Sequence, residues 1–432
     1  MRIGFPHICV FQNRLKLTIR QSLIAFLLLG VAACSSFPSP KSASNTVGLI
    51  GASDEIVRQS GEKILASNGN AADAMAAMLM TASVAMPSRA GLGASGMCQI
   101  LDSSGAQVKT LDFTSRPMSF DRKIAAPALA RGVFLLQSRY GIKPWKDVLA
   151  DPIAKAERGV KVSETLGKDI LMTGGLKASW KQMKTGDVLK QPKLAATLRT
   201  LSSNGAAALY NGKIATSIVG QSDQIIQEDL KNFKAFYMDS IDISQSGKRI
   251  YFANPSTVSS EGYMLWRNHG SALKADEVAQ SMTALADKIV LPEKSVQGEA
   301  FLAADKSGLV IVCNVTMGTP FGTRQLLNEG FYLANHVRKS ALSTSFLNII
   351  ETNPDITDVI DAWAGTSDYA LVDGLLAVED FASYRPELEK YQTEHRKDAM
   401  KNFVRLSCEQ GYPNHADSCQ EKDNISFALK KE

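Results

Sequence analysis

Residues 295–323 read SVQGEAFLAADKSGLVIVCNVTMGTPFGT, and they predict the centre of a β-sheet. Two apolar runs, Ala300–Ala304 and Leu309–Val315, are separated by the turn sequence Asp-Lys-Ser-Gly at 305–308. Short apolar runs around a turn that contains Gly are typical of a β-hairpin. The second run is almost all Val, Ile and Cys, so we expect its strand to be covered on both faces. The stretch therefore predicts a buried hairpin.

Two helices are predicted near the start of the folded region. After Asp54, apolar residues recur at helical intervals up to the stop signal Asn68-Gly69. The second helix, Ala71–Ala85, is almost all Ala and Met, so it has no polar face and must be buried. Pro87 ends it, and a Gly-rich segment leads into a strand at Met97–Leu101. This segment is no phosphate-binding loop, because such loops run from a strand into a helix.

The composition fits a globular protein with a sizeable core. The chain has 432 residues, of which 45% are hydrophobic and 21% charged, enough for one large domain or two ordinary ones. The 48 basic and 43 acidic residues give a net charge of +5. Since Lys and Arg form no clusters in the sequence, we expect no nucleic-acid partner. No cofactor is expected either.

The N-terminus has the pattern of an export signal. Basic residues precede the apolar run Leu23–Ala33, which is too short to span a bilayer as a helix. The run ends Val-Ala-Ala-Cys and resembles a bacterial lipobox, so we expect a signal peptide at 1–33 and lipid on Cys34. An ordinary cleaved signal followed by an incidental Cys is the alternative.

The residue after Cys34 gives a more specific expectation about location. Ser35 at this position resembles signals sorted to the outer membrane, which predicts a lipoprotein facing the periplasm. The lipidated Cys and a Pro/Ser-rich, polar tether occupy 34–46, and the tether has no reason to fold.

Besides Cys34, four cysteines remain in the expected mature chain. Cys98 and Cys313 lie in apolar strand-like runs, so we expect small, free, buried hydrophobic side chains there. Cys408 and Cys419 flank a short loop in an exported chain, where a disulfide is permitted and expected. A metal site that uses this pair with His415 is a minor alternative, because the spacing matches no zinc pattern. We therefore expect no metal.

The hairpin resembles the start of the small subunit of γ-glutamyltransferases, which are glutathione hydrolases. That family reads Thr-Thr-His-aromatic-Ser, two apolar residues, Asp-Lys-x-Gly, a strand with Thr-x-Thr, and Phe-Gly-Thr/Ser-Gly. Eight positions agree without a gap: Phe301, Asp305, Lys306, Gly308, Thr316, Thr319, Phe321 and Gly322. Further segments agree in order, from GNAADA at 69–74 to PSTVSSEG at 255–262. The chain is identified as a member of this family over about 300 residues, a length that suits one domain.

Membership implies the N-terminal-nucleophile hydrolase architecture, an α+β sandwich of two stacked, mostly antiparallel sheets between helical layers. The residues agree with it, since they predict short strands with hairpin turns and an all-helical middle at 128–230. We place this domain at 47–375. The resemblance then fades, and 376–432 are expected to form a helical extension, with a charged amphipathic helix at Leu376–Arg405.

The resemblance also implies a site that has lost its nucleophile. In active relatives a Thr freed by self-cleavage attacks the γ-glutamyl carbonyl, with its own α-amino group as the base. Gly298 stands at that position and is followed by Glu299, so no catalytic residue is assigned with confidence. Thr316 corresponds to the Thr that supports the nucleophile.

The positions that bind substrate in the family differ as well. The Arg that clamps the α-carboxylate corresponds to Thr114, and the Asn that ends the Thr-x-Thr strand corresponds to Gly318. The acidic pair for the α-amino group falls near Arg338-Lys339, and the serine pair is only partly kept in Ser343-Thr344-Ser345. The oxyanion-hole Gly-Gly appears as Asp368-Tyr369, where a carboxylate would destabilise a developing oxyanion.

These losses predict a catalytically degenerate, uncleaved member of the family that serves as a binding or scaffold lipoprotein. Its ligand would be a γ-glutamyl or amino-acid-like small molecule, and it could pair with an active relative. The alternatives are an active glutathione hydrolase with another nucleophile, and a metal- or ligand-binding protein built on the C-terminal Cys/His loop. Fold alone does not separate them, because chemistry depends on the site.

Overall fold

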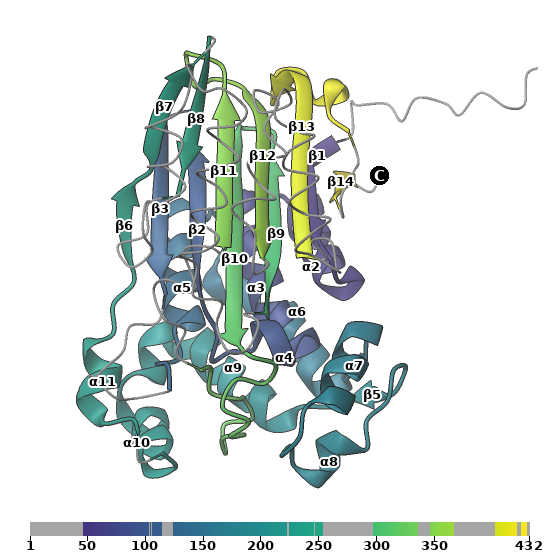
Figure 1. Cartoon of the computed structure of the whole chain (residues 1–432), viewed down its shortest axis with the longest axis vertical. Coiled ribbons are helices and arrows are strands. Elements are labelled where there is room, and N and C mark those ends of the chain that lie inside the picture. The colour runs from purple at the N-terminus through teal and green to yellow at the C-terminus, as the bar shows by residue number, and fades with distance from the viewer. Residues whose placement is uncertain are drawn as a thin grey trace, which may run out of the picture. The chain divides into compact units, whose positions relative to one another are not determined.

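Two antiparallel β-sheets form the centre of the fold (Figure 1). The larger sheet has the strand order β14 (Ile425–Leu429), β1 (Thr46–Ala52), β9 (Gln297–Asp305), β10 (Leu309–Gly318), β2 (Ser95–Asp102), β3 (Gln107–Phe113) and β6 (Phe236–Asp239). The smaller sheet has the order β13 (Asn402–Tyr412), β12 (Val359–Thr366), β11 (Phe346–Thr352), β8 (Lys248–Phe252) and β7 (Ile241–Gln245).

The computed structural model describes residues 46–102, 104, 106–114, 124–222, 224–245, 247–253, 297–335, 346–366, 402–420 and 425–429. All of them lie in one compact unit, Asn45–Glu432. Within these ranges no helix is long and apolar enough to cross a membrane. The expected signal peptide, Cys34 and the tether up to residue 45 lie outside the described residues.

The helices form a layer next to the larger sheet, in which the earlier helices contact its strands and the later ones pack mainly on other helices. They are α2 (Glu55–Ala66), α3 (Ala71–Ala85), α4 (Pro87–Ala90), α5 (Leu129–Tyr140), α6 (Trp145–Arg158), α7 (Glu164–Met172), α8 (Ala178–Lys181), α9 (Pro192–Asn204), α10 (Gly212–Gly220) and α11 (Gln227–Asn232). Two short strands, β4 (Val160–Lys161) and β5 (Val188–Leu189), pair with each other among these helices. The expectation of an all-helical middle was therefore wrong at this pair.

The hairpin predicted at the centre of the sheet is confirmed. β9 and β10 pair around a turn at 305–308, and every residue of β10 is buried. Asp305 fixes the turn, because its carboxylate accepts the Ser307 backbone N–H at 2.8 Å. The other oxygen of the same carboxylate accepts the Ala71 N–H at 2.8 Å, which joins the turn to the first residue of α3.

The buried helix Ala71–Ala85 is also confirmed, and all fifteen of its residues are buried. Asn70 caps it, and Asn70 and Asp73 form a reciprocal capping box that satisfies two backbone donors. The Asp73 carboxylate also accepts the Gln137 side chain at 3.0 Å and the Ile142 backbone N–H at 3.1 Å. One buried carboxylate thus fixes both the start of α3 and the loop between α5 and α6.

Side chains of the central hairpin alternate between two hydrophobic cores. Phe301 and Ala303 of β9 face the helices, in the core between α3 and the larger sheet. Ala300 and Leu302 face the smaller sheet, in the core between the two sheets. The described helices cover only the larger sheet, and no second helical layer is found in the described part of the chain. The stacked antiparallel sheets themselves agree with the expected α+β sandwich.

The expected helical C-terminal extension is wrong where the structure describes it. Residues 402–412 form β13 at the edge of the smaller sheet, and 425–429 form β14 at the edge of the larger one. Val404, Leu406 and Cys408 are buried at every second position, which is the period of a strand. The helix was expected from the charge of the preceding segment, and residues 376–401 lie outside the described ranges.

Candidate functional site

The ends of β9 and β10 bring two of the predicted site residues together. Gly298 and Thr316 are directly opposite each other in the antiparallel register. The Thr316 hydroxyl donates to the Gln297 backbone oxygen at 2.5 Å and accepts the Gly318 N–H at 2.9 Å. Gln297–Gly298 is the peptide bond that self-cleavage would break. The structure therefore keeps a hydrogen-bond donor on the carbonyl of that bond, although the attacking side chain is missing.

The space beside Gly298 is filled by the smaller sheet and by the neighbouring strand. A Cβ atom placed on Gly298 would lie 2.5 Å from the Val315 backbone oxygen, closer than real Cβ contacts come. It would also lie 3.2 Å from Cγ2 of Thr366 on β12 and 3.3 Å from Cε1 of Phe346 on β11. A side chain at this position would have to displace backbone, so the local packing requires glycine.

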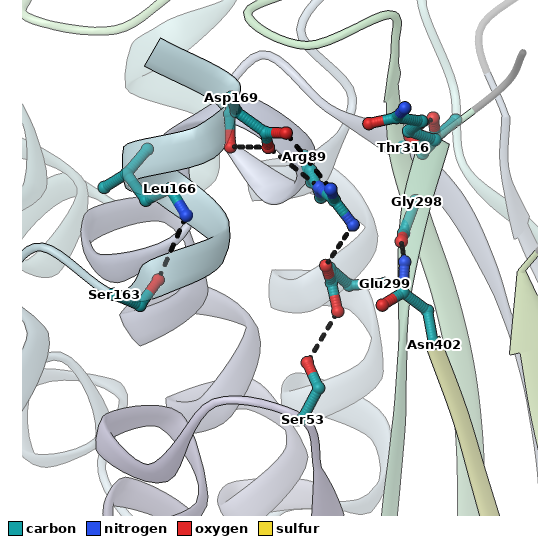
Figure 2. A network of polar contacts seen from close by, with 11 residues as sticks. Ser53, Arg89, Ser163, Leu166, Asp169, Gly298, Glu299, Thr316 and Asn402 are labelled. Carbon is teal, nitrogen blue, oxygen red and sulfur yellow. Dashed lines mark hydrogen bonds and ion pairs between the residues drawn. The ribbon is translucent and has the colours of Figure 1, made fainter. Parts of the chain in front are cut away.

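The carbonyl oxygen of Gly298 accepts a hydrogen bond from β13. The Asn402 side-chain amide donates to this oxygen at 2.7 Å, across from β13 (Figure 2). Since β13 belongs to the smaller sheet, this bond joins the two sheets at the beginning of β9. It adds to the packing that fixes Gly298 in place.

The position expected to bind the substrate α-carboxylate is buried and hydrogen-bonded to its own neighbour. Thr114 follows β3, which lies three strand spacings from β9, about 14 Å. Its backbone N–H and hydroxyl both donate to one oxygen of Asp112, at 2.8 and 2.6 Å, and the residue is 2% exposed. Thr114 and Gly298 are therefore not brought together.

The remaining predicted positions divide into two groups. Gly318 ends β10 with a φ of +81°, a backbone conformation that favours glycine over the Asn of the family. Ser343, Thr344, Asp368 and Tyr369 lie outside the described residues, as does the Arg338-Lys339 pair.

A disulfide joins Cys98 to Cys313, so the expectation of two free thiols was wrong. The two residues are directly opposite each other on β2 and β10. The sequence could not show this, because the pair is 215 residues apart and its contact depends on strand register. A second disulfide joins Cys408 to Cys419, the pair expected from the spacing. Both cysteines near His415 are thus oxidised, and no metal-binding group of three side chains occurs among the described residues.

A buried ion cluster lies on the other face of β9, directly beside Gly298 (Figure 2). Glu299 is 1% exposed, and its Oε1 lies 3.6 Å from the Arg89 guanidinium of α4. Arg89 also donates to both oxygens of Asp169 on α7, at 2.8 and 3.1 Å. The Ser53 hydroxyl donates to the second Glu299 oxygen at 2.7 Å. We call Ser53, Arg89, Asp169 and Glu299 the Arg89 cluster.

The Arg89 cluster holds two carboxylates for one guanidinium. Burial raises the pKa of Glu299 to about 7, against the opposing effects of Arg89 and the Ser53 hydrogen bond. Asp169 and Asp54 raise this pKa further through like-charge repulsion. Glu299 therefore titrates near neutral pH. Sequence reasoning missed this cluster, because its charged members come from α4, α7 and β9 and form no motif.

We expect Glu299→Gln to stabilise the protein at pH 8 and to leave its stability almost unchanged at pH 5. The folded-state pKa is raised, so the carboxyl group favours the folded state at low pH and loses that contribution as pH rises from about 4.5 through 7. The shift corresponds to about 3 kcal/mol in the free energy of unfolding. Urea unfolding of both proteins from pH 5 to 8 measures it.

The exposed variant Glu228→Gln serves as the control for the loss of a carboxylate elsewhere on the chain. Equal pH dependence of the wild type and Glu299→Gln would show that Glu299 does not titrate in this range.

A comparison with known protein families finds a match to part of the chain. The family profile described as Gamma-glutamyltranspeptidase matches residues 58–266. Over these residues the chain belongs to the γ-glutamyltranspeptidase family. The match covers α3, the Gly-rich segment before β2 and the helical middle, and it ends before β9. The hairpin that carries Gly298 lies outside this match, and its likeness to the family rests on the motif positions in the sequence.

Individual relatives of the family are distant. A glutathione hydrolase proenzyme of Pseudomonas aeruginosa is 25% identical over 266 residues, which cover 54% of this chain and 47% of that protein. The capsule biosynthesis protein CapD proenzyme of Bacillus anthracis is 25% identical over 254 residues, which cover 54% of this chain and 48% of that protein. This family member spans about half the length of the curated relatives it matches.

The fold extends beyond the range of sequence similarity. The crystal structure of a cephalosporin acylase from Bacillus halodurans superimposes with a TM-score of 0.61 at 17% identity, covering 81% of this chain and 84% of that one. At this identity the likeness shows the fold alone. It supports the N-terminal-nucleophile hydrolase sandwich for this family member, with β13 and β14 as parts of its sheets.

Proposed function

We propose that the chain is an unprocessed, non-hydrolytic member of the γ-glutamyltranspeptidase family that acts as a binding or scaffold protein. The surroundings of Gly298 carry this proposal. The nucleophile position has no side chain, and a Cβ there would meet the Val315 backbone oxygen at 2.5 Å. Without a hydroxyl at this position there is no attacking group. The packing around Gly298 also leaves no room for a side chain that could carry a hydroxyl.

The neighbouring hydroxyl does not replace the nucleophile. The Thr316 hydroxyl donates to the Gln297 oxygen and accepts the Gly318 N–H, so it is already used as a donor and as an acceptor within the hairpin. A hydroxyl without a base within hydrogen-bond reach is a weak nucleophile. On the opposite face of β9, Glu299 is directed into the Arg89 cluster and away from Gly298. These contacts favour a site without turnover.

The location and ligand belong to the same proposal. The N-terminal pattern that ends at Cys34 supports an exported, lipid-anchored protein at the outer membrane, facing the periplasm. The ligand class that the family suggests is a γ-glutamyl or amino-acid-like molecule. In a scaffold role, the protein would bind another protein, such as an active relative of the family.

Two measurements on the purified full chain test the proposal. We expect intact-mass spectrometry to find one unbroken polypeptide that begins at a lipid-modified Cys34. We also expect no product from a γ-glutamyl anilide or from glutathione. Fragments that break next to Gly298 would contradict an unprocessed chain, and turnover by the wild type would make the protein an active hydrolase. An unmodified N-terminal peptide would remove the lipid anchor from the proposal.

Gly298→Thr is the informative variant in the same assay. We expect no turnover, because the new side chain must displace the Val315 carbonyl and because Thr114 supplies no guanidinium for the substrate carboxylate. Losses in groups that act together are not additive, so a single repair recovers little. Gly298→Ala is the steric control and should destabilise the fold similarly. Turnover by Gly298→Thr alone would show an intact substrate pocket.

A further inference from the structure

Lysines gather on one lobe of the helical layer, although the sequence contains no run of them. We call residues 160–193 the basic lobe. It comprises β4, α7, α8 and β5; the last three lie together in Figure 1, and β4 pairs with β5. Its seven lysines are all exposed: Lys161, Lys168, Lys177, Lys181, Lys184, Lys190 and Lys193. With three carboxylates and no Arg, the lobe has a net charge of +4, against +5 for the whole chain.

The basic lobe also exposes two neighbouring aliphatic side chains. Leu171 is 86% exposed and Met172 is 84% exposed, the highest values for large hydrophobic side chains in the described part of the chain. They end α7 and share its outer stripe with Lys168, which lies three and four residues earlier. Val188 of β5 is 56% exposed on the same lobe. Apolar and cationic side chains are thus presented to solvent together.

The outward direction of Leu171 and Met172 is fixed by the contacts on the inner side of the lobe. Asp169, on the inner face of α7, is held by Arg89 through two hydrogen bonds. Trp180 of α8 packs edge-on against Phe321 and Tyr332, with ring centroids 5.7 and 5.3 Å apart. The lobe is therefore attached to the body by buried polar and aromatic contacts, and its apolar tip remains outside.

We propose that the basic lobe docks on an anionic phospholipid bilayer. Leu171 and Met172 would enter the boundary between headgroups and acyl chains, while the lysines around them stay at the level of the phosphates. Each lysine close to an anionic surface favours binding by roughly fivefold. The proposal concerns this lobe alone and holds whether or not Cys34 carries lipid.

The side chains favour a lipid surface over other polyanions. Nucleic-acid sites commonly add Arg and exposed aromatic rings to their lysines, for base contacts and for stacking. The basic lobe has no Arg, and its one aromatic residue, Trp180, is 7% exposed and packed inward. Flexible lysines around aliphatic side chains are the composition of peripheral membrane-binding surfaces. Charge complementarity and apolar exposure thus point to the same partner.

Photocrosslinking in the full chain tests the proposal without depending on the anchor. A diazirine amino acid replaces Leu171, or Ile142 as the control, because Ile142 is 69% exposed in the loop between α5 and α6, outside the lobe. After irradiation on phosphatidylcholine vesicles with phosphatidylglycerol, we expect phospholipid adducts at position 171 and few at 142. Equal yields at the two positions, or adducts to a protein or nucleic acid at 171, would overturn the proposal.

A charge-matched pair of variants tests the part played by the lysines. We expect Lys168→Glu, Lys177→Glu and Lys181→Glu together to lower the adduct yield by about a hundredfold. Lys146→Glu, Lys231→Glu and Lys306→Glu change the net charge equally at exposed positions outside the lobe and should have little effect. Thermal unfolding checks that both variants fold. A similar loss in both, or a yield unaffected by phosphatidylglycerol, would contradict a specific basic surface.

Discussion

Replacing Cys98 and Cys313 together by Ala is expected to lower the free energy of unfolding by about 5 kcal/mol. The disulfide closes a loop with a sequence separation of 215 residues, so it removes much more freedom from the unfolded chain than a short crosslink does. Both cysteines are buried on β2 and β10, and the substitution also removes packing at the centre of the larger sheet. Urea unfolding of the unreduced proteins measures the loss.

The second disulfide provides the matched control. Cys408 and Cys419 are separated by 11 residues, so their removal should cost about 3 kcal/mol at most. If the Cys98/Cys313 variant does not fold, the wild type titrated with reductant gives the same comparison. Free-thiol labelling of the unfolded, unreduced protein must leave all four positions unmodified. Labelling at Cys98 and Cys313 would return the pair to the free thiols expected from the sequence.

Replacing Arg89 by Met should lower the free energy of unfolding by about 3–5 kcal/mol at pH 8. The substitution leaves the carboxylates of Asp169 and Glu299 buried without their cation, which costs more than the ion pairs themselves contribute. It also releases α7 and α4 from each other and from the beginning of β9. Chemical unfolding at pH 8 measures the effect.

Two comparisons separate this effect from a general loss of charge. Arg58→Met breaks an ion pair with the half-exposed Glu55 and should cost less than about 1 kcal/mol. Adding Asp169→Asn and Glu299→Gln to Arg89→Met removes the stranded charges and should restore most of the stability. No recovery in the triple variant would mean that Arg89 acts through packing and not through its charge.

The sequence predicted those parts of the fold whose signals are local. The β9–β10 hairpin and helix α3 were correct, because an apolar run around a Gly turn and an Ala/Met helix without a polar face have few other solutions. Residues 376–432 were expected to be a helical extension, because the charge of Leu376–Arg405 suits a solvated helix, whereas residues 402–412 form a strand with alternating burial. The local period was the better guide.

Most of the candidate site could not be predicted from the sequence, because its contacts join residues that are far apart along the chain. Gly298 and Thr316 lie opposite each other because one hairpin carries both, and the roles that the family motif gives them stay a prediction. The Arg89 cluster and the Cys98–Cys313 disulfide join residues from distant elements, so only the packing of α4, α7, β2 and β10 reveals them. The crowding of Gly298 by Phe346 and Thr366 depends on the stacking of two sheets. No spacing in the sequence encodes these contacts.

The place of β1 in the larger sheet has a consequence for how the chain reaches its native state. β1 lies between β9 and β14, so Leu49 pairs with Ala304 on one side and with Phe427 on the other. Both partners are more than half of the chain away. Such distant pairings close large loops, and folding slows as they dominate. One edge of β1 therefore stays unpaired until β9 has been made and the other until β14 has been made, so we expect the larger sheet to be completed late in folding.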